Sequence, residues 1–199
     1  MKKVLISSFD MEIGGVERSL ISMLDNFDYD NYDVDLMLYS HSGDLMKLLP
    51  KKPNLLAESK KYKTFRLSIG ETIKRGNFAI GMARLAAKYN TKKIANKKNL
   101  QDSGYIQMQY MWKYALPFLP KIEKQYDVAI SYLWPHYFIS DKVMAKIKIG
   151  WIHTDYSTIY TDIDMDLLMW NKFDYIVSIS DEVTEAFLKK YPSLKDKII

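Results

Sequence analysis

The fold is decided by residues 2–24, which read KKVLISSFDMEIGGVERSLISML. The apolar run at 4–6 is bounded by polar residues, a pattern typical of a strand buried on both faces in a parallel sheet. A loop ending in Gly14 and Gly15 follows, and apolar residues then recur at helical spacing over 16–24. The stretch therefore predicts a strand, a glycine turn and a helix in succession.

The turn after this first strand is a candidate anion site. In such a unit the helix begins at the carboxyl edge of the sheet, where its free N–H groups and its dipole favour a phosphate. Gly14 and Gly15 lack a Cβ, so an anion can approach the backbone closely. A tight turn without a ligand is the alternative. A dinucleotide role has little support, because G-x-G-x-x-G needs three spaced glycines and an acidic residue after the second strand, where Ser40 and His41 stand.

Strands and helices alternate along the rest of the chain. Predicted strands cover 34–39, 54–57, 127–133, 147–152 and 175–179, and predicted helices cover 44–49, 135–144, 164–171 and 181–190. Ser180 is the predicted N-cap of the last helix, and 197–199 is typical of a strand that is only beginning. We therefore expect an α/β fold with a Rossmann-like, doubly wound parallel sheet and helices on both faces.

One segment interrupts this alternation, a basic helical insertion at about 60–118. Apolar residues at 65–90 predict one or two amphipathic helices, and 105–116 predicts another that is rich in Met and aromatic residues. The region 51–100 holds 14 Lys or Arg against 2 acidic residues, a net of +12, whereas the whole chain carries +5. The positive charge therefore belongs to the insertion.

The charge of the 60–98 segment has three interpretations. A solvated helical face is the first. An anionic membrane surface is the second, because Lys beside Leu, Ile and Phe on a helix suits the interface of a bilayer. Nucleic acid is the third, but no recognisable reading motif accompanies the charge, so we expect no nucleic-acid partner.

Composition limits the class of protein. With 199 residues, 48% hydrophobic and 14% aromatic, the chain can bury a substantial core. The absence of cysteine excludes disulfides, a thiolate zinc site and a cysteine nucleophile. The chain has no signal-peptide pattern and no run near the ~20 apolar residues that cross a bilayer. We expect a soluble, cytoplasmic protein, at most peripheral at the inner face of the cell membrane.

Three segments together resemble a known family. They are the opening strand with GGVERSL, the strand IGWIHTDY and the closing YIVSISDEVTEAFLKKYP. In order and spacing they resemble the N-terminal domain of GT-B glycosyltransferases of family 4, the retaining "group 1" type. The resemblance spans nearly all of the chain and is weakest in the basic insertion. It implies that 1–199 is the Rossmann-like, acceptor-side half of a two-domain enzyme.

The resemblance also implies an activity. Such enzymes transfer a sugar from a nucleotide-sugar donor, with retention, to a cell-surface glycan, glycolipid or glycoprotein acceptor. Gly14 and Gly15 match the family's glycine loop, which lies against the donor diphosphate, and His153 matches a histidine near the transferred sugar. The family's donor-binding C-terminal domain, with its E-x7-E motif, is absent from this sequence. We therefore expect hexosyltransferase activity only at full length, with the donor as substrate, no cofactor and no metal.

The chemistry of sugar transfer gives further residues two interpretations each. Breaking a glycosyl–phosphate bond places negative charge on the departing diphosphate, which N–H donors and cations stabilise. Arg18 can reach a phosphate or lie on the surface. His153 can bind a sugar hydroxyl or be structural, and Asp155 can serve as a base or cap a loop.

Four residues near the end of the strand at 127–133 are acceptor-binding candidates, because aromatic faces stack on sugars. Aromatic residues at such positions also fill cores, so a core role is the alternative. The four are Ser131, Tyr132, Trp134 and His136. Two other functions also stay open for the whole chain: a non-catalytic Rossmann-like binding module, and a nucleotide-dependent epimerase or reductase.

Overall fold

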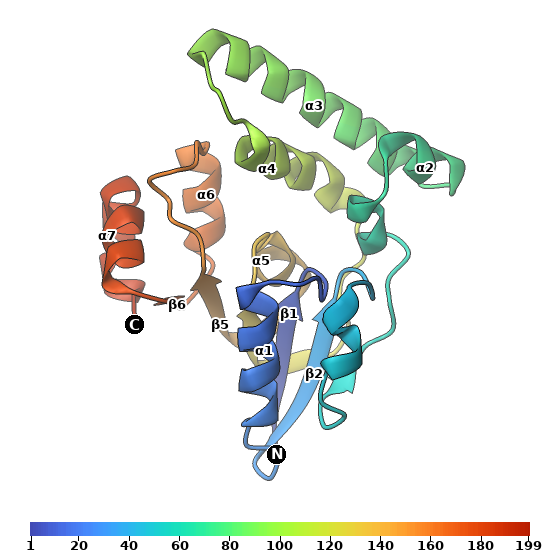
Figure 1. Ribbon diagram of the computed structural model, residues 1–199, viewed down its shortest axis with the longest axis vertical. Coiled ribbons are helices and arrows are strands. Elements are labelled where there is room, and N and C mark those ends of the chain that lie inside the picture. The colour runs from blue at the N-terminus through green and yellow to red at the C-terminus, as the bar shows by residue number, and fades with distance from the viewer.

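The computed structural model describes residues 1–199 as an α/β protein with one six-stranded sheet (Figure 1). The strand order is β3-β2-β1-β4-β5-β6, and every neighbouring pair is parallel. The strands are β1 (Lys2–Ser8), β2 (Tyr32–Leu38), β3 (Asn54–Leu55), β4 (Gln125–Ser131), β5 (Met144–Ile152) and β6 (Tyr175–Ser178). The predicted Rossmann-like parallel sheet is confirmed.

Helices connect consecutive strands. The α-helices are α1 (Gly15–Asp25), α2 (Ile69–Lys74), α3 (Phe78–Lys98), α4 (Gly104–Ala115), α5 (Tyr137–Lys142), α6 (Ile163–Trp170) and α7 (Asp181–Lys190). Four 3₁₀ helices complete the set: η1 (Asp44–Leu48), η2 (Tyr62–Arg66), η3 (Leu116–Phe118) and η4 (Pro192–Lys197). No helix is both long and apolar enough to cross a bilayer.

The sheet has a core on each face. On one face, Val4 and Ile6 of β1 pack in a cluster with Leu20 of α1. On the other face, Leu5 belongs to a larger cluster that takes its side chains from α4, α5, α6 and α7. Both faces of β1 are therefore buried, as the uninterrupted apolar run predicts.

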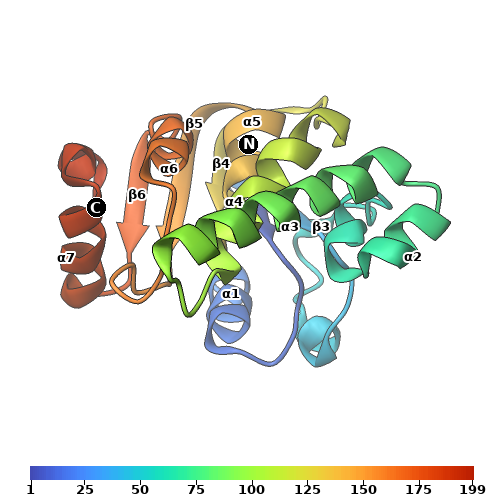
Figure 2. The ribbon, with the colours of Figure 1, turned by 90° about the horizontal axis from the view of Figure 1, so that it is seen from above.

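The insertion lies over the carboxyl ends of the strands. Seen from above, α3 runs across the molecule on the outer side of α4 (Figure 2). Helix α3 continues to Lys98, beyond the predicted end at residue 90, and Asn99 ends it in a left-handed conformation with φ 51°. The predicted extent was wrong because the polar second half of α3 shows little apolar periodicity.

Other boundaries differ by a few residues. The helix predicted at 135–144 is shorter, because α5 ends at Lys142 and β5 already begins at Met144. Strand β3 has only two residues. At the end of the chain, Ser180 accepts a hydrogen bond from the Val183 N–H as the predicted N-cap. Ile198 forms a parallel bridge with Ile176, as expected for the start of a strand.

Candidate functional site

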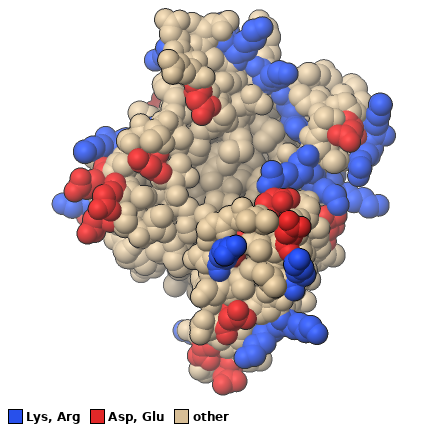
Figure 3. Space-filling model, in the orientation of Figure 1, with Lys and Arg blue, Asp and Glu red and all other residues tan.

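The strand order reverses between β1 and β4. From β1 the chain proceeds outward to β2 and β3, and from β4 it proceeds the other way to β5 and β6. In open α/β sheets, ligands bind outside the carboxyl ends of the strands at such a reversal. Helix α1 begins here, directly after Gly14, and the molecule is hollowed between α1 and the insertion helices (Figure 3). The glycine pair therefore stands beside this crevice.

The two glycines differ in their surroundings. Gly14 is the N-cap of α1 in an extended conformation, and no side chain caps the helix. A Cβ on Gly14 would lie 2.2 Å from a carboxylate oxygen of Glu17, whereas a Cβ on Gly15 would meet nothing within 4 Å. The start of α1 is thus open at Gly15, and Glu17 places a negative charge against Gly14.

A chain of contacts joins α1 to the ends of β4 and β5. The Ser19 hydroxyl lies 2.7 Å from the Tyr132 hydroxyl. The Tyr132 ring is centred 4.9 Å from the His153 ring and 5.0 Å from the ring of Trp151. Because Ser19 is one turn along α1 from Gly15, the structure brings the glycine pair and His153 to the same side of the sheet.

His153 has one ring nitrogen without a partner. Its Nε2 is buried and accepts or donates no hydrogen bond within the protein. Burial lowers the pKa of His153 below its ordinary value, and a hydrogen bond with the Tyr132 backbone acts in the opposite direction. This nitrogen is closed off from solvent, so a ligand hydroxyl reaches it only after neighbouring side chains move, and its unmade hydrogen bond costs about 1–3 kcal/mol.

Arg18 and Asp155 are both exposed. Arg18 lies on the surface of the first turn of α1. Asp155 accepts a hydrogen bond of 2.8 Å from the Ser157 N–H, and hydrogen bonds from Ser157 lower the pKa of its carboxyl. It lines a groove of about 290 Å³ together with α7. Asp155 therefore caps its own loop and faces α7, which matches the second of its two interpretations.

The four acceptor-binding candidates are all buried, with Trp134 the most exposed at 8%. The Ser131 hydroxyl lies 2.8 Å from Nδ1 of His136, whose ring is centred 4.5 Å from that of Trp170. Burial, with a smaller contribution from His153, lowers the pKa of His136 to about 3, so its ring is neutral. Ser131 and His136 therefore belong to the core.

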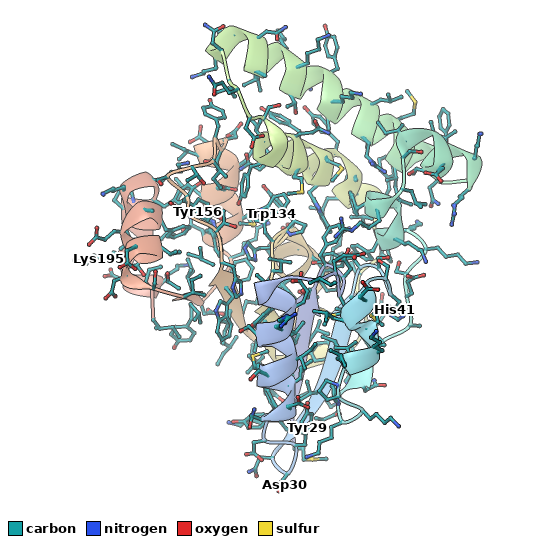
Figure 4. All side chains as sticks on the ribbon, in the orientation of Figure 1. Tyr29, Asp30, His41, Trp134, Tyr156 and Lys195 are labelled. Carbon is teal, nitrogen blue, oxygen red and sulfur yellow. The ribbon has the colours of Figure 1, made fainter.

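Trp134 lies nearer to the insertion, between α4 and α5 (Figure 4). Its ring is centred 4.7 Å from the ring of Tyr105, at the start of α4, and its indole N–H has no partner. The Tyr105 hydroxyl in turn lies 2.8 Å from the Tyr156 hydroxyl. Trp134 thus connects the end of β4 to the roof that α4 forms over the sheet.

An ion pair with a buried carboxylate holds the loop before α1, and no local sequence pattern indicates it. Asp10, 1% exposed, is paired with Arg66 of η2. The Arg66 guanidinium also lies over the Phe9 ring, 4.6 Å from its centroid. Asp10 follows the first strand in the sequence, but its partner is 56 residues away, so the pairing could not be predicted from the local pattern. The insertion therefore positions the glycine loop directly.

The loop after β2 supports the same segment. The Met11 N–H donates to the Ser42 carbonyl at 2.9 Å, and the Met11 carbonyl accepts from the Leu45 N–H at 2.9 Å. Gly43 makes this approach feasible, since it has φ +105° and a Cβ there would lie 2.2 Å from the Met11 backbone. The route of the chain into α1 is thus fixed from both sides.

No group of three or more His, Asp or Glu side chains is placed to hold a metal ion. Comparison with known proteins returns neither a matching family model nor a matching curated protein. A sheet of this order serves many activities, so function must be inferred from the geometry of the crevice and from the residue types around it.

Proposed function

We propose that this chain is the acceptor-side domain of a retaining GT-B glycosyltransferase of the family 4 type, which uses a nucleotide-sugar donor. The observation that carries the proposal is the contact chain from α1 through Ser19 and Tyr132 to His153. It brings an uncapped helix start and the half-buried ring of His153 to the same side of the sheet. Sugar transfer from a diphosphate uses N–H donors or cations for the leaving anion and hydrogen-bonding side chains for the sugar.

The start of α1 would stabilise the leaving diphosphate. Its N–H groups have no side-chain cap, and the helix dipole favours negative charge there. Gly15 is exposed and open, so a phosphate can approach the backbone. Such donors stabilise the charge that develops as the glycosyl–phosphate bond breaks. Same-face attack guided by the leaving phosphate requires no dedicated base, which agrees with Asp155 facing α7.

His153 would bind a hydroxyl of the transferred sugar. Because burial keeps its imidazole neutral, it can pair with a hydroxyl as donor or acceptor without adding charge to the site. The acceptor would occupy the hollow between α1 and α4, with Trp134 and Tyr105 at its roof. We propose that a second, donor-binding domain supplies the nucleotide contacts, at the inner face of the cell membrane.

The test is nucleotide release from a panel of sugar donors by the two-domain protein. Gly15→Asp places a negative charge where the diphosphate would lie, while the open space at Gly15 lets the chain fold. We expect kcat/KM to fall by roughly 100-fold or more, because a preorganised anion site contributes that much to a transition state. Gly15→Asn, equal in size but neutral, should retain most of the activity.

His153→Ala should lower activity and His153→Gln should restore part of it, since Gln keeps a hydrogen-bonding group. Parent-like release by both Gly15→Asp and His153→Ala would contradict the site. The same assay separates the other functions. Ligand binding without nucleotide release would indicate a non-catalytic binding module, and turnover that depends on a nicotinamide cofactor would indicate an epimerase or reductase.

A further inference from the structure

Helix α3 carries an apolar stripe on its outer side that nothing covers. Phe78, Met82, Leu85 and Tyr89 are 63%, 45%, 41% and 72% exposed. They are spaced by four, three and four residues, so they lie on one face of the helix. The opposite side of α3 holds most of its buried residues, and α4 packs against this helix. The stripe therefore points away from the protein.

Lysines lie at and beyond the C-terminal end of this stripe. At 100° per residue, Lys88 and Lys92 fall to one side of its line and Lys93 and Lys97 to the other, and only Lys88 stands level with the stripe itself. All four are exposed, and none takes part in an ion pair. Helix α3 contains no acidic residue at all. An exposed apolar stripe that is continued along the same helix by a run of cations suits a helix that lies in the interface of an anionic bilayer.

The apolar surface continues beyond the helix. Phe78 lines a groove of about 380 Å³ together with Pro117 and Phe118, and Phe118 is itself 43% exposed. Lys61 stands at the rim of this groove. The surface over α2 and α3 carries many more Lys and Arg than Asp and Glu (Figure 3). The charge pattern thus extends over the same side of the insertion.

We propose that the outer face of α3 binds in the plane of an anionic lipid bilayer. The four apolar side chains enter the boundary between headgroups and acyl chains, and the flanking lysines meet lipid phosphates. A second copy of this chain is a poorer occupant, because it would bring two rows of lysines together without an acidic partner. Nucleic acid is poorer too, because its phosphates would face the apolar centre of the stripe.

This binding mode would set the distance from the bilayer to the crevice. Beneath α3 lies α4, and Tyr105 of α4 contacts Trp134 and Tyr156 near the ends of β4 and β5. Packed helices are separated by about 10 Å, so the bilayer surface would stand about two helix layers above the crevice. The proposal does not rest on sugar transfer, since it concerns binding to lipid alone.

The experiment is co-sedimentation of the protein with vesicles of phosphatidylcholine containing about a third phosphatidylglycerol, at low and high salt. We expect binding at low salt that weakens in high salt and is weak on pure phosphatidylcholine. Leu85→Gln with Tyr89→Gln should reduce the affinity roughly tenfold or more, because it removes the apolar centre. Lys88→Gln with Lys92→Gln should also reduce it.

Matched controls lie elsewhere on the surface. Leu168 of α6 is 70% exposed, so Leu168→Gln changes an exposed apolar residue outside the stripe. Lys47→Gln with Lys195→Gln removes two exposed lysines outside α3. Both controls should bind vesicles as the parent does. No binding of the parent at low salt would overturn the proposal, and so would equal binding by the stripe variant.

Two further outcomes would reassign the face. A concentration-dependent dimer that the Leu85→Gln, Tyr89→Gln variant dissociates would make it an interface between copies of this chain. Binding of single-stranded RNA that displaces the protein from vesicles and is lost in the stripe variant would assign the face to nucleic acid. None of these measurements uses a sugar donor, so their failure is distinguishable from failure of the proposed activity.

Discussion

At the scale of single residues, the start of α1 is shaped by Glu17. Its carboxylate lies where a Gly14 side chain would be, and the residue is only 9% exposed. No side chain caps the helix by a hydrogen bond, so this carboxylate in the first turn is the negative charge nearest to the positive end of the helix dipole. A bound diphosphate would seek the same place. Glu17 therefore opposes anion binding while it stabilises the ligand-free helix.

Replacing Glu17 with Gln separates these two effects. We expect Glu17→Gln to lower the free energy of unfolding by about 0.3–1 kcal/mol, because a charge favourable to the dipole is lost. The affinity for pyrophosphate should rise severalfold, because the competing charge is gone. Urea unfolding and calorimetric titration measure the two quantities.

Asp25→Asn, at the other end of α1, is the matched control and should leave pyrophosphate binding unchanged. Weaker or unchanged pyrophosphate binding by Glu17→Gln would show that no anion approaches this helix start.

At the scale of elements, the insertion and the first βα connection are held together by Asp10 and Arg66. The carboxylate is almost fully buried, whereas the Arg66 side chain is 48% exposed. Removing the cation leaves a buried charge unpaired, which is more harmful than losing a surface pair. The pair therefore couples the folding of η2 to that of the loop before α1.

Arg66→Gln should lower the free energy of unfolding by about 2 kcal/mol, which is less than for a fully buried pair because Arg66 is half exposed. Asp10→Asn combined with Arg66→Gln should lose less than the sum of the single changes, with a coupling of about 1 kcal/mol in urea unfolding. Lys172→Gln breaks the more exposed pair with Asp141 and should cost less than about 1 kcal/mol. Equal losses of unfolding free energy for Arg66→Gln and Lys172→Gln would show that burying the Asp10 carboxylate does not require its pairing with Arg66.

The helices and strands were largely predictable, because apolar runs and apolar residues at helical spacing are local patterns in the sequence. The strand at 4–6, the helix after Gly15 and the cap at Ser180 were each predicted within a few residues. The buried positions of His136 and Asp10 were not, since both depend on residues that are distant in sequence. His136 packs on Trp170, and Asp10 pairs with Arg66. Local sequence therefore predicts which residues stand near the carboxyl edge but not which of them face the crevice.

At the scale of the whole molecule, a buried polar network joins the insertion to the C-terminal helices. Asp166 of α6 is fully buried and accepts hydrogen bonds from Gln109 of α4, at 2.6 Å, and from the Tyr191 hydroxyl that follows α7. Gln109 also bonds the backbone of Asp162 at the start of α6. This network fixes α4, the roof of the crevice, relative to β5 and β6 at one edge of the sheet.

The network predicts an unusual dependence of stability on pH. Burial raises the pKa of Asp166 to about 7, against the smaller lowering effects of Tyr191, Gln109 and Lys190. The folded state therefore holds a proton that the unfolded chain releases near pH 4, so this group's contribution to the unfolding free energy falls as pH rises from about 4 to about 7. Above about pH 7 the full cost of a buried carboxylate is present.

Asp166→Asn cannot titrate, so its stability relative to the parent should increase between pH 5 and pH 8 by on the order of 2–4 kcal/mol. Asp164→Asn, an exposed change on the same helix, should run parallel to the parent over this range. Urea unfolding at a series of pH values measures the difference, and a constant gap between Asp166→Asn and the parent would mean that the pKa of Asp166 is not raised by its burial.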